Sequence, residues 1–392
     1  MNRNLLLLAL CQGLFLTNNV VFIAINGLVG LSLAPAAWMA TLPVTSYVVG
    51  SALSAGLVAR TQALWGRQRS FQLGLIVAVF STLLCAYAAV SNNFWLLVAA
   101  TLIAGFYNAN AALYRFAGPE LVAPAFKERA ISLVLAGGIV GAFAGPNLAR
   151  ATRSLLAVPF AAAYLSLVVV ALLSLSAVSL IRFAPHVAAK AGASHGRRLA
   201  QIMRQPEFIV AVAAGALGYG VMNLLMAATP IAMQQCGLAF ADTALVLEWH
   251  VLGMFVPSFF TGHLIRRFGT LPIMATGALL NLVCISVALT GVELEQFVVA
   301  LFTLGVGWNF LYIGGTTLLT AAYRQEEKYK AQGAMDFCVF ATMALTSFAS
   351  GALVTSQGWT WLNLGSLPVV AVIGAALFWL ASVRRRAALA VS

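Results

Sequence analysis

Long apolar runs recur along the whole chain, and the short turns between them hold most of its basic residues. Of the 392 residues, 62% are hydrophobic and only 8% are charged, whereas a soluble globular domain usually has about 25% charged residues. A chain of this composition must bury its apolar surface in lipid. Because one crossing needs about 20 apolar residues, the length allows about twelve membrane helices with short connections.

The apolar runs predict twelve helices, with one long polar stretch between the sixth and the seventh. We expect the helices at about residues 4–31, 38–59, 70–90, 94–115, 129–149, 155–182, 207–234, 242–265, 270–291, 296–322, 331–356 and 362–383. The polar stretch 184–206 is expected to link an N-terminal bundle, 1–183, to a C-terminal bundle, 207–392. The first run continues past Asn18 and Asn19 without a small-residue cleavage site, so we expect a retained first helix rather than a signal peptide.

The net charge of +12 is distributed unevenly between the two sides of the expected membrane. Nearly all lysines and arginines fall on one side, whereas Arg150 and Arg153 fall on the other, together with Asp242, Glu293 and Glu295. The positive-inside rule then places both termini and the central polar stretch in the cytoplasm, which requires an even number of crossings. We expect a multi-pass protein of a bacterial inner membrane. The basic residues are scattered in turns, so nucleic-acid binding is not expected.

The reactive residue types show no arrangement typical of an enzyme. No pair of the five cysteines has metal-ligand or redox-motif spacing; they are Cys11, Cys85, Cys236, Cys284 and Cys338. A zinc-protease motif and a phosphate-binding loop are both missing from the sequence. We therefore expect no enzyme, no cofactor and no metal, and any transport would be driven by an ion gradient or by the substrate's own gradient.

The two halves of the chain repeat each other. Tyr107-Asn108 in the fourth expected helix corresponds to Trp308-Asn309 in the tenth. The following turns also match, with Lys127-Glu128-Arg129-Ala130 against Lys328-Tyr329-Lys330-Ala331. In the first and seventh helices, the run that begins at Asn19 matches the run that begins at Asn223. Such a duplication predicts two six-helix bundles with a substrate site near the bilayer midplane between them.

A basic turn after the eighth expected helix carries a family resemblance. Gly262-His263-Leu264-Ile265-Arg266-Arg267-Phe268-Gly269 resembles Gly-x-x-x-Asp-Arg-x-Gly, the signature turn of the major facilitator superfamily. The resemblance covers nearly all of the chain, and it implies an all-α membrane protein of twelve helices in two pseudo-symmetric bundles that works as a secondary transporter. In that family the acid of the turn helps to latch the bundles. Here Arg266 takes its place, and the first-half counterpart, Gly56 to Arg69, also lacks the acid. We name Arg115, Arg266, Arg267 and Gly269 as candidate gating residues.

A second motif bears on the direction of transport. Gly141-Ala142-Phe143-Ala144-Gly145-Pro146 resembles the antiporter motif Gly-x-x-x-Gly-Pro of the same family, although the double glycine that often follows is replaced by Ala149 and Arg150. Gly145 and Pro146 are therefore further gating candidates, and export is favoured. The alternatives are proton-coupled uptake of a nutrient, a siderophore-like solute or a vitamin, or a membrane sensor that keeps the fold without transport.

Four expected helices carry amides and aromatic rings at helical spacing, so each set shares one face of its helix. Aromatic rings with a few amides suit an organic substrate that is ring-bearing or amphiphilic. The candidate substrate-binding residues are Asn19, Phe22, Asn26, Tyr107, Asn108, Asn110, Tyr219, Asn223, Met226, His250, Trp308, Asn309 and Tyr312. The alternative is that these amides hydrogen-bond between helices and hold the bundles together. We expect a monomer whose partners are a small-molecule substrate, a proton and membrane lipid.

Three ionisable residues inside apolar runs are candidates for proton coupling. Glu248 is placed deepest and is the first candidate, Asp336 is the second, and His250 could relay protons beside them. The alternatives remain open at this point: Asp336 could be a structural partner of Arg115, and His250 could be a hydrogen-bonded packing residue.

Overall fold

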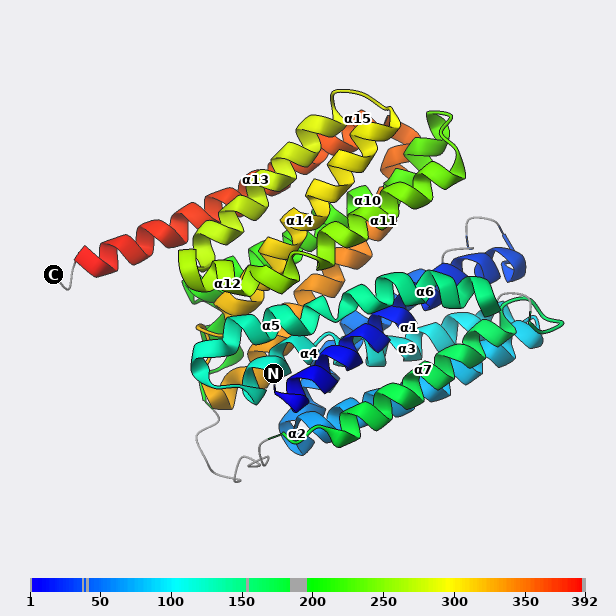
Figure 1. Cartoon of the computed structure of the whole chain (residues 1–392), viewed down its shortest axis with the longest axis horizontal. Helices are drawn as coiled ribbons and strands as arrows, with labels where there is room; N and C mark the ends of the chain where they lie inside the picture. Colours follow the sequence, from blue (N-terminus) through cyan, green and yellow to red (C-terminus); the bar gives the residue numbers. More distant parts are fainter. Residues whose placement is uncertain (1, 37–38, 40–41, 153–154, 184–195, 390–392) are drawn as a thin grey trace. The chain divides into compact units, whose positions relative to one another are not determined.

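The computed structural model describes residues 2–36, 39, 42–152, 155–183 and 196–389, and these form helices joined by short turns, with no strand among them (Figure 1). Within these residues, ten helices are long and apolar enough to cross a membrane, or eleven if one bent pair counts as a span. One of the ten, α2 (Leu42–Val90), has 49 residues and is interrupted at Gly66, where the backbone leaves the helical region. At 1.5 Å per residue its two halves each reach across a bilayer, which brings the count to twelve.

Contacts divide the chain into two units, which we describe separately. Unit 1 comprises residues 1–191 together with 332–341. Its helices are α1 (Arg3–Leu33), α2, α3 (Phe94–Ala111), α4 (Tyr114–Ala117), α5 (Lys127–Ala136), α6 (Gly138–Thr152) and α7 (Ala161–Leu180), with 3-10 turns η2 (Gly118–Leu121) and η3 (Pro124–Phe126). Polar caps set two of the starts, because Asn2 accepts from the backbone of Asn4 and Asn93 from that of Leu96.

Unit 2 comprises residues 192–331 together with 342–392. Its helices are α8 (Leu199–Met203), α9 (Pro206–Val212), α10 (Gly218–Gln235), α11 (Phe240–Phe255), α12 (Ser258–Phe268), α13 (Thr270–Ala288), α14 (Leu294–Leu319) and α15 (Lys328–Leu389). The π-helical turn η4 (Ala213–Leu217) joins α9 to α10, and the 3-10 turn η5 (Gln325–Glu327) precedes α15. The ten residues 332–341 of α15 are the part that contacts assign to unit 1.

Glycines at matching places in the two halves let the chain turn between neighbouring helices. Gly66 ends the first half of α2 with φ 79°, and Gly269 separates α12 from α13 with φ 91°. Both values lie in the region that an L side chain rarely adopts, so each turn needs glycine. The backbone conformation of the turn therefore explains why the signature motif ends in a glycine, Gly269.

Small residues also let helices cross closely within each unit. A Cβ on Gly105 of α3 would lie 2.4 Å from the backbone of Gly50 on α2. In unit 2, a Cβ on Gly305 of α14 would lie 2.5 Å from the carbonyl oxygen of His250 on α11. Each half therefore has a crossing of this kind, at which only glycine fits, and the crossing at Gly105 corresponds to the one at Gly305 in the sequence duplication.

Four expected helices are interrupted in the structure, and the fourth divides into α3, which ends at Ala111, and α4, which begins at Tyr114. The fifth breaks at Gly137 into α5 and α6, and the eighth bends by 40° at Pro257 between α11 and α12. Proline removes a backbone donor and clashes with the preceding turn, which explains the bend. The seventh contains the π-helical turn η4, and such turns often lie at functional sites in helices.

Candidate functional site

Three rings of unit 2 pack together, and we call Tyr219, Trp308 and Tyr312 the aromatic group. Trp308 and Tyr312, one turn apart on α14, are stacked with ring centroids 4.9 Å apart. The ring of Tyr219 on α10 meets both edge-on, each at 5.4 Å. Trp308 and Tyr312 are 3% and 7% exposed, whereas Tyr219 is half-buried and forms the accessible side of the group.

The aromatic group has features of a binding surface. Tyr219 lies two residues after the end of the π-helical turn, and Met226, also half-buried, lies two turns later on the same face of α10. The indole Nε1 of Trp308 is buried and has no hydrogen-bond partner among the described residues. A buried donor without a partner is costly, so this one is available to a ligand or a water molecule.

The other polar candidates of unit 2 bind neighbouring helices. Asn223 donates to Thr346 at 3.0 Å and to Ser347 at 2.9 Å on α15. Asn309 donates to the Met254 carbonyl at 2.6 Å and to Ser258 at 2.5 Å. These contacts favour the reading in which the amides hold helices together.

His250 is buried between α11 and α14. Its Nδ1 lies 2.7 Å from the carbonyl oxygen of Leu301. Its Nε2 is buried and has no hydrogen-bond partner among the described residues. The side chain has no exposed surface, so its contacts match the alternative of a packing histidine.

In unit 1, Phe22 and Asn26 of α1 face the core of the bundle. Phe22 packs on Tyr47 with ring centroids 4.8 Å apart, and Asn26 accepts a 2.8 Å hydrogen bond from the hydroxyl of Tyr164. Tyr47 and Tyr164 are absent from the sequence candidates, because neither belongs to a run of polar residues on one face. No signal in a single sequence links Asn26 to a tyrosine 138 residues away.

Of the remaining candidates in unit 1, only Asn19 is partly open. It is half-buried, and its Oδ1 has no partner among the described residues. Asn108 donates to Ser51 at 2.8 Å, and Asn110 donates to the Ser70 carbonyl at 2.8 Å. The Tyr107 hydroxyl is buried and has no hydrogen-bond partner among the described residues. These two asparagines, like Asn309, contact other helices.

The candidate carboxylates differ sharply in their surroundings. Glu248 is exposed on α11, about 12 Å from the start of that helix at 1.5 Å per residue. Asp336 is buried and forms an ion pair with Arg115, with side-chain exposures of 3% and 1%. The structural partnership between Arg115 and Asp336 is therefore present within unit 1.

The gating candidates also have defined surroundings. A Cβ on Gly145 would lie 2.9 Å from Val20, and one on Gly141 would lie 2.5 Å from the backbone of Thr17. The glycines of the antiporter-like motif therefore bring α6 close to α1. The side chain of Pro146 lies outside the described residues. Arg266 and Arg267 are exposed, and Gly269 forms the turn described above.

A polar network at the break in α2, directly after Gly66, was not expected from the sequence. Arg67 pairs with Glu120 at 2.9 Å, donates to Gln332 at 2.7 Å and also donates to Gln62. The acid of the family motif is absent from both signature turns. Arg67 of the first turn nevertheless contacts the segment 332–341 of unit 1, through its hydrogen bond to Gln332. The sequence signal that could have found it is a basic residue directly after the turn glycine, Gly66-Arg67.

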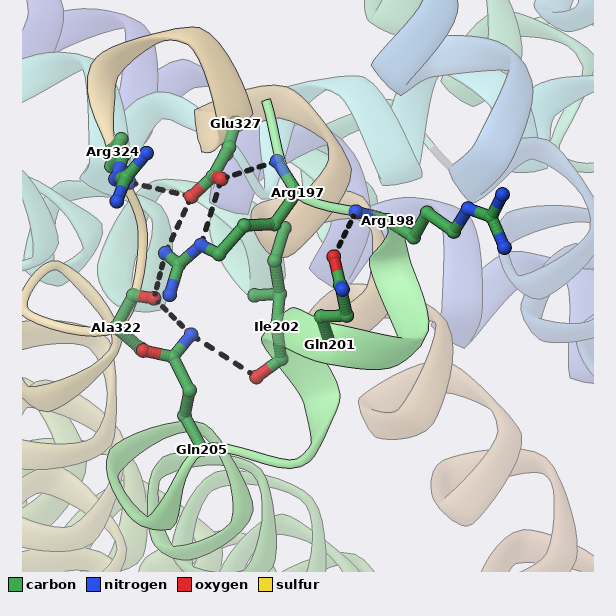
Figure 2. A network of polar contacts seen from close by, with 8 residues as sticks. All are labelled: Arg197, Arg198, Gln201, Ile202, Gln205, Ala322, Arg324 and Glu327. Carbon is green, nitrogen blue, oxygen red and sulfur yellow. Dashed lines mark hydrogen bonds and ion pairs between the residues drawn. The ribbon is translucent and has the colours of Figure 1, made fainter. Parts of the chain in front are cut away.

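A second unexpected network anchors the residues before α8 (Figure 2). The carboxylate of Glu327, which is fully buried, accepts hydrogen bonds from the backbone and side chain of Arg197 at 2.6–2.9 Å and from the backbone of Arg324 at 2.9 Å. The hydrogen bond to Glu327 raises the pKa of Arg197. Gln205 donates to the carbonyl oxygen of Ala322 at 2.5 Å beside it. These contacts fix residues 197–205 to the turn between α14 and α15.

Comparisons with known proteins agree on a single family. The family model of the Major Facilitator Superfamily matches residues 210–391. The riboflavin transporter RfnT of Brucella anthropi is 39% identical over 374 residues, which cover 95% of this chain and 94% of the relative. The MFS-type transporter YdeG of Bacillus subtilis is 29% identical over 341 residues, which cover 83% of this chain and 79% of that relative. Among solved structures, the FucP transporter of E. coli in its outward conformation has a TM-score of 0.76 at 15% identity, over 96% of this chain and 98% of its own.

Proposed function

The chain belongs to the major facilitator superfamily of membrane transporters, and we propose that it carries riboflavin or a closely related flavin into the cell. The observation that supports the substrate is the 39% identity to a riboflavin transporter over 95% of this chain. The expected alternative of vitamin uptake thus gains support over export. The antiporter-like glycines that favoured export pack α6 against α1, and this contact needs no antiport to explain it.

The aromatic group suits the ring system of such a substrate. A flavin has a flat, electron-poor tricyclic ring and a flexible polyhydroxyl chain. Aromatic rings stack on flat ligands, and the half-buried ring of Tyr219 is held in place by edge-on contacts with Trp308 and Tyr312. The free Nε1 of Trp308 can donate to a carbonyl or hydroxyl oxygen of the ligand. We propose that this group holds the ring.

Riboflavin binding to purified protein tests the site. Stacking on tyrosine or tryptophan quenches flavin fluorescence, so titration of riboflavin with protein reports binding directly. Tyr219→Ala should weaken binding about tenfold, because losing one aromatic stacking partner costs about 0.5–1.5 kcal/mol beyond the lost contact area. Tyr219→Phe should bind like the parent. Tyr87→Ala, at an exposed tyrosine of α2, is the matched control. Unchanged affinity in Tyr219→Ala would remove the aromatic group from the site.

We further propose that uptake is driven by protons, with Glu248 as the first coupling residue and Asp336 as the second. A carboxylate in the middle of a membrane helix is costly unless it is protonated, paired or wetted. Asp336 has a partner in Arg115. Glu248 is exposed beside Leu245 and Trp249. Protonation would change the charge at either place and so bias one conformation over another.

Transport in liposomes separates coupling from binding. Glu248→Gln mimics the protonated acid, so it should abolish accumulation driven by a pH gradient while exchange of substrate continues. Asp336→Asn is compared in the same way, and His250→Gln tests for a relay. If Glu248→Gln and Asp336→Asn both accumulate substrate at the parent rate, coupling runs through neither carboxylate, and a sodium-driven or uniport mechanism is preferred.

A further inference from the structure

A hollow of about 580 Å³ lies at one end of unit 1. It is lined by Arg3 of α1, Gln68 of α2 and the residues Ser179 to Phe183 at the end of α7. The start of α1 and the end of α7 lie together there (Figure 1). This is the end that the positive-inside rule assigns to the cytoplasm. None of its lining residues belongs to the aromatic group or to the coupling candidates.

Side-chain hydrogen bonds build the walls of this hollow. The amide nitrogen of Gln68 lies 3.2, 3.1 and 2.9 Å from the carbonyl oxygens of Val178, Ser179 and Ile181. The side chain of Asn4 hydrogen-bonds the backbone of Arg182 in both directions, at 3.2 and 3.3 Å. The free carbonyl groups at a helix end would repel an anion. Here the neutral side-chain amide of Gln68 donates hydrogen bonds to these carbonyl groups at the end of α7.

Two arginine side chains give the hollow its charge. Arg3 and Arg182 are exposed, and neither forms an ion pair with an acid among the described residues. Arg67, in contrast, is paired with Glu120. The lining itself contains no acid. Two guanidinium groups without carboxylates in a built hollow match the chemistry of a phosphate, which guanidinium binds with paired hydrogen bonds.

The hollow is continuous with an apolar surface. Along α7, the exposed side chains Val169, Leu173 and Leu180 follow one face at helical spacing. On α2, which packs against α7, Ile76 and Phe80 are exposed in the same way. A ligand with a phosphate head and hydrocarbon chains fits this combination of a charged hollow and an apolar stripe better than free phosphate does.

We propose that the hollow binds the phosphate headgroup of one anionic phospholipid, with its acyl chains lying along α2 and α7. Arg3 and Arg182 bind the phosphate, while Gln68 and Asn4 hold the backbone around it. The bound lipid joins the first helix of unit 1 to its last. The site is separate from the proposed flavin site, so it stands or falls independently of the substrate.

Thermal unfolding of the purified full chain in a neutral detergent tests the proposal. The protein is titrated with phosphatidylglycerol, with phosphatidylcholine or with inorganic phosphate, because a ligand that binds the folded state raises the unfolding temperature. Phosphatidylglycerol should stabilise the protein, and the other two should not. One arginine near anionic lipid contributes about fivefold in affinity, so R3Q/R182Q should bind phosphatidylglycerol roughly 25-fold more weakly.

Two further variants make the result specific. R3K/R182K keeps the charges and should retain most of the stabilisation, which excludes a folding defect at these positions. R198Q/R385Q removes two exposed arginines elsewhere and should respond to phosphatidylglycerol as the parent does. Equal responses of R3Q/R182Q and R198Q/R385Q would overturn the site. Equal stabilisation by phosphatidylcholine would remove the role of the anionic head, and equal stabilisation by inorganic phosphate would remove the role of the lipid.

Discussion

Breaking the buried ion pair between Arg115 and Asp336 should destabilise the protein strongly. Asp336→Ala removes the acid that pairs with the buried guanidinium of Arg115, and removal of one partner of a buried pair costs about 3–5 kcal/mol. Arg115 keeps its hydrogen bond to the Ala112 carbonyl, and its Cζ lies 4.4 Å from the ring centroid of Phe116. These contacts offset part of the loss, so we expect Asp336→Ala to lower the free energy of unfolding by about 3 kcal/mol.

A double-mutant cycle measures the pair itself. R115M/D336L replaces both charged groups by apolar side chains of similar length and should lie within about 1 kcal/mol of the parent, because desolvation largely offsets the attraction in a buried pair. The assay is unfolding in detergent micelles, followed by tryptophan fluorescence. Arg150→Met, at an exposed arginine of unit 1, controls for loss of a charge. The reasoning is refuted if Asp336→Ala costs less than about 1 kcal/mol, or if the double variant loses the sum of the two single losses.

Three more predictions concern packing, anchoring and topology. Gly105→Ala should lower the free energy of unfolding by about 1–3 kcal/mol, since the added Cβ would collide with the backbone of α2. Gly374→Ala, at a position with open space around it, should be neutral. Equal thermal stability of the two variants would contradict the close crossing of α2 and α3. Glu327→Ala should make the chain before α8 more sensitive to protease than Glu326→Ala does, and equal cleavage rates would show that the anchor is not needed. In right-side-out vesicles, an impermeant maleimide should label the exposed native Cys236. The same reagent should not label Asn2→Cys in a C236S background, because position 2 is expected in the cytoplasm. External labelling at position 2 would reverse the proposed orientation.

The sequence predicts the helices well because its signals are local. Apolar length gives the crossings, and the glycine of the signature turn marks the change of direction at Gly269, which is confirmed by its positive φ. The breaks at Gly137 and Pro257 were not predicted. A single glycine or proline is compatible with a continuous membrane helix, since neighbouring helices can satisfy the freed backbone groups.

The site was less predictable, because helical spacing shows which residues share a face but not what that face contacts. Asn19 and Asn26 lie seven residues apart on α1, yet Asn26 binds Tyr164 in the bundle while Asn19 remains half-buried. Asn309 matches Asn108 in the repeat, and both bind the neighbouring helix of their own unit. The duplication thus repeated a packing contact, and the rotation of each helix depends on partners far away in the sequence.

The most direct test of the account is riboflavin transport by the purified protein in liposomes. With an inward-directed proton gradient, the liposomes should accumulate riboflavin above the outside concentration, and collapse of the gradient by a protonophore should release the excess. Protein that binds riboflavin without any flux would indicate a membrane sensor with this fold. Liposomes that neither bind nor accumulate riboflavin, while the same preparation transports another solute, would contradict the proposed substrate.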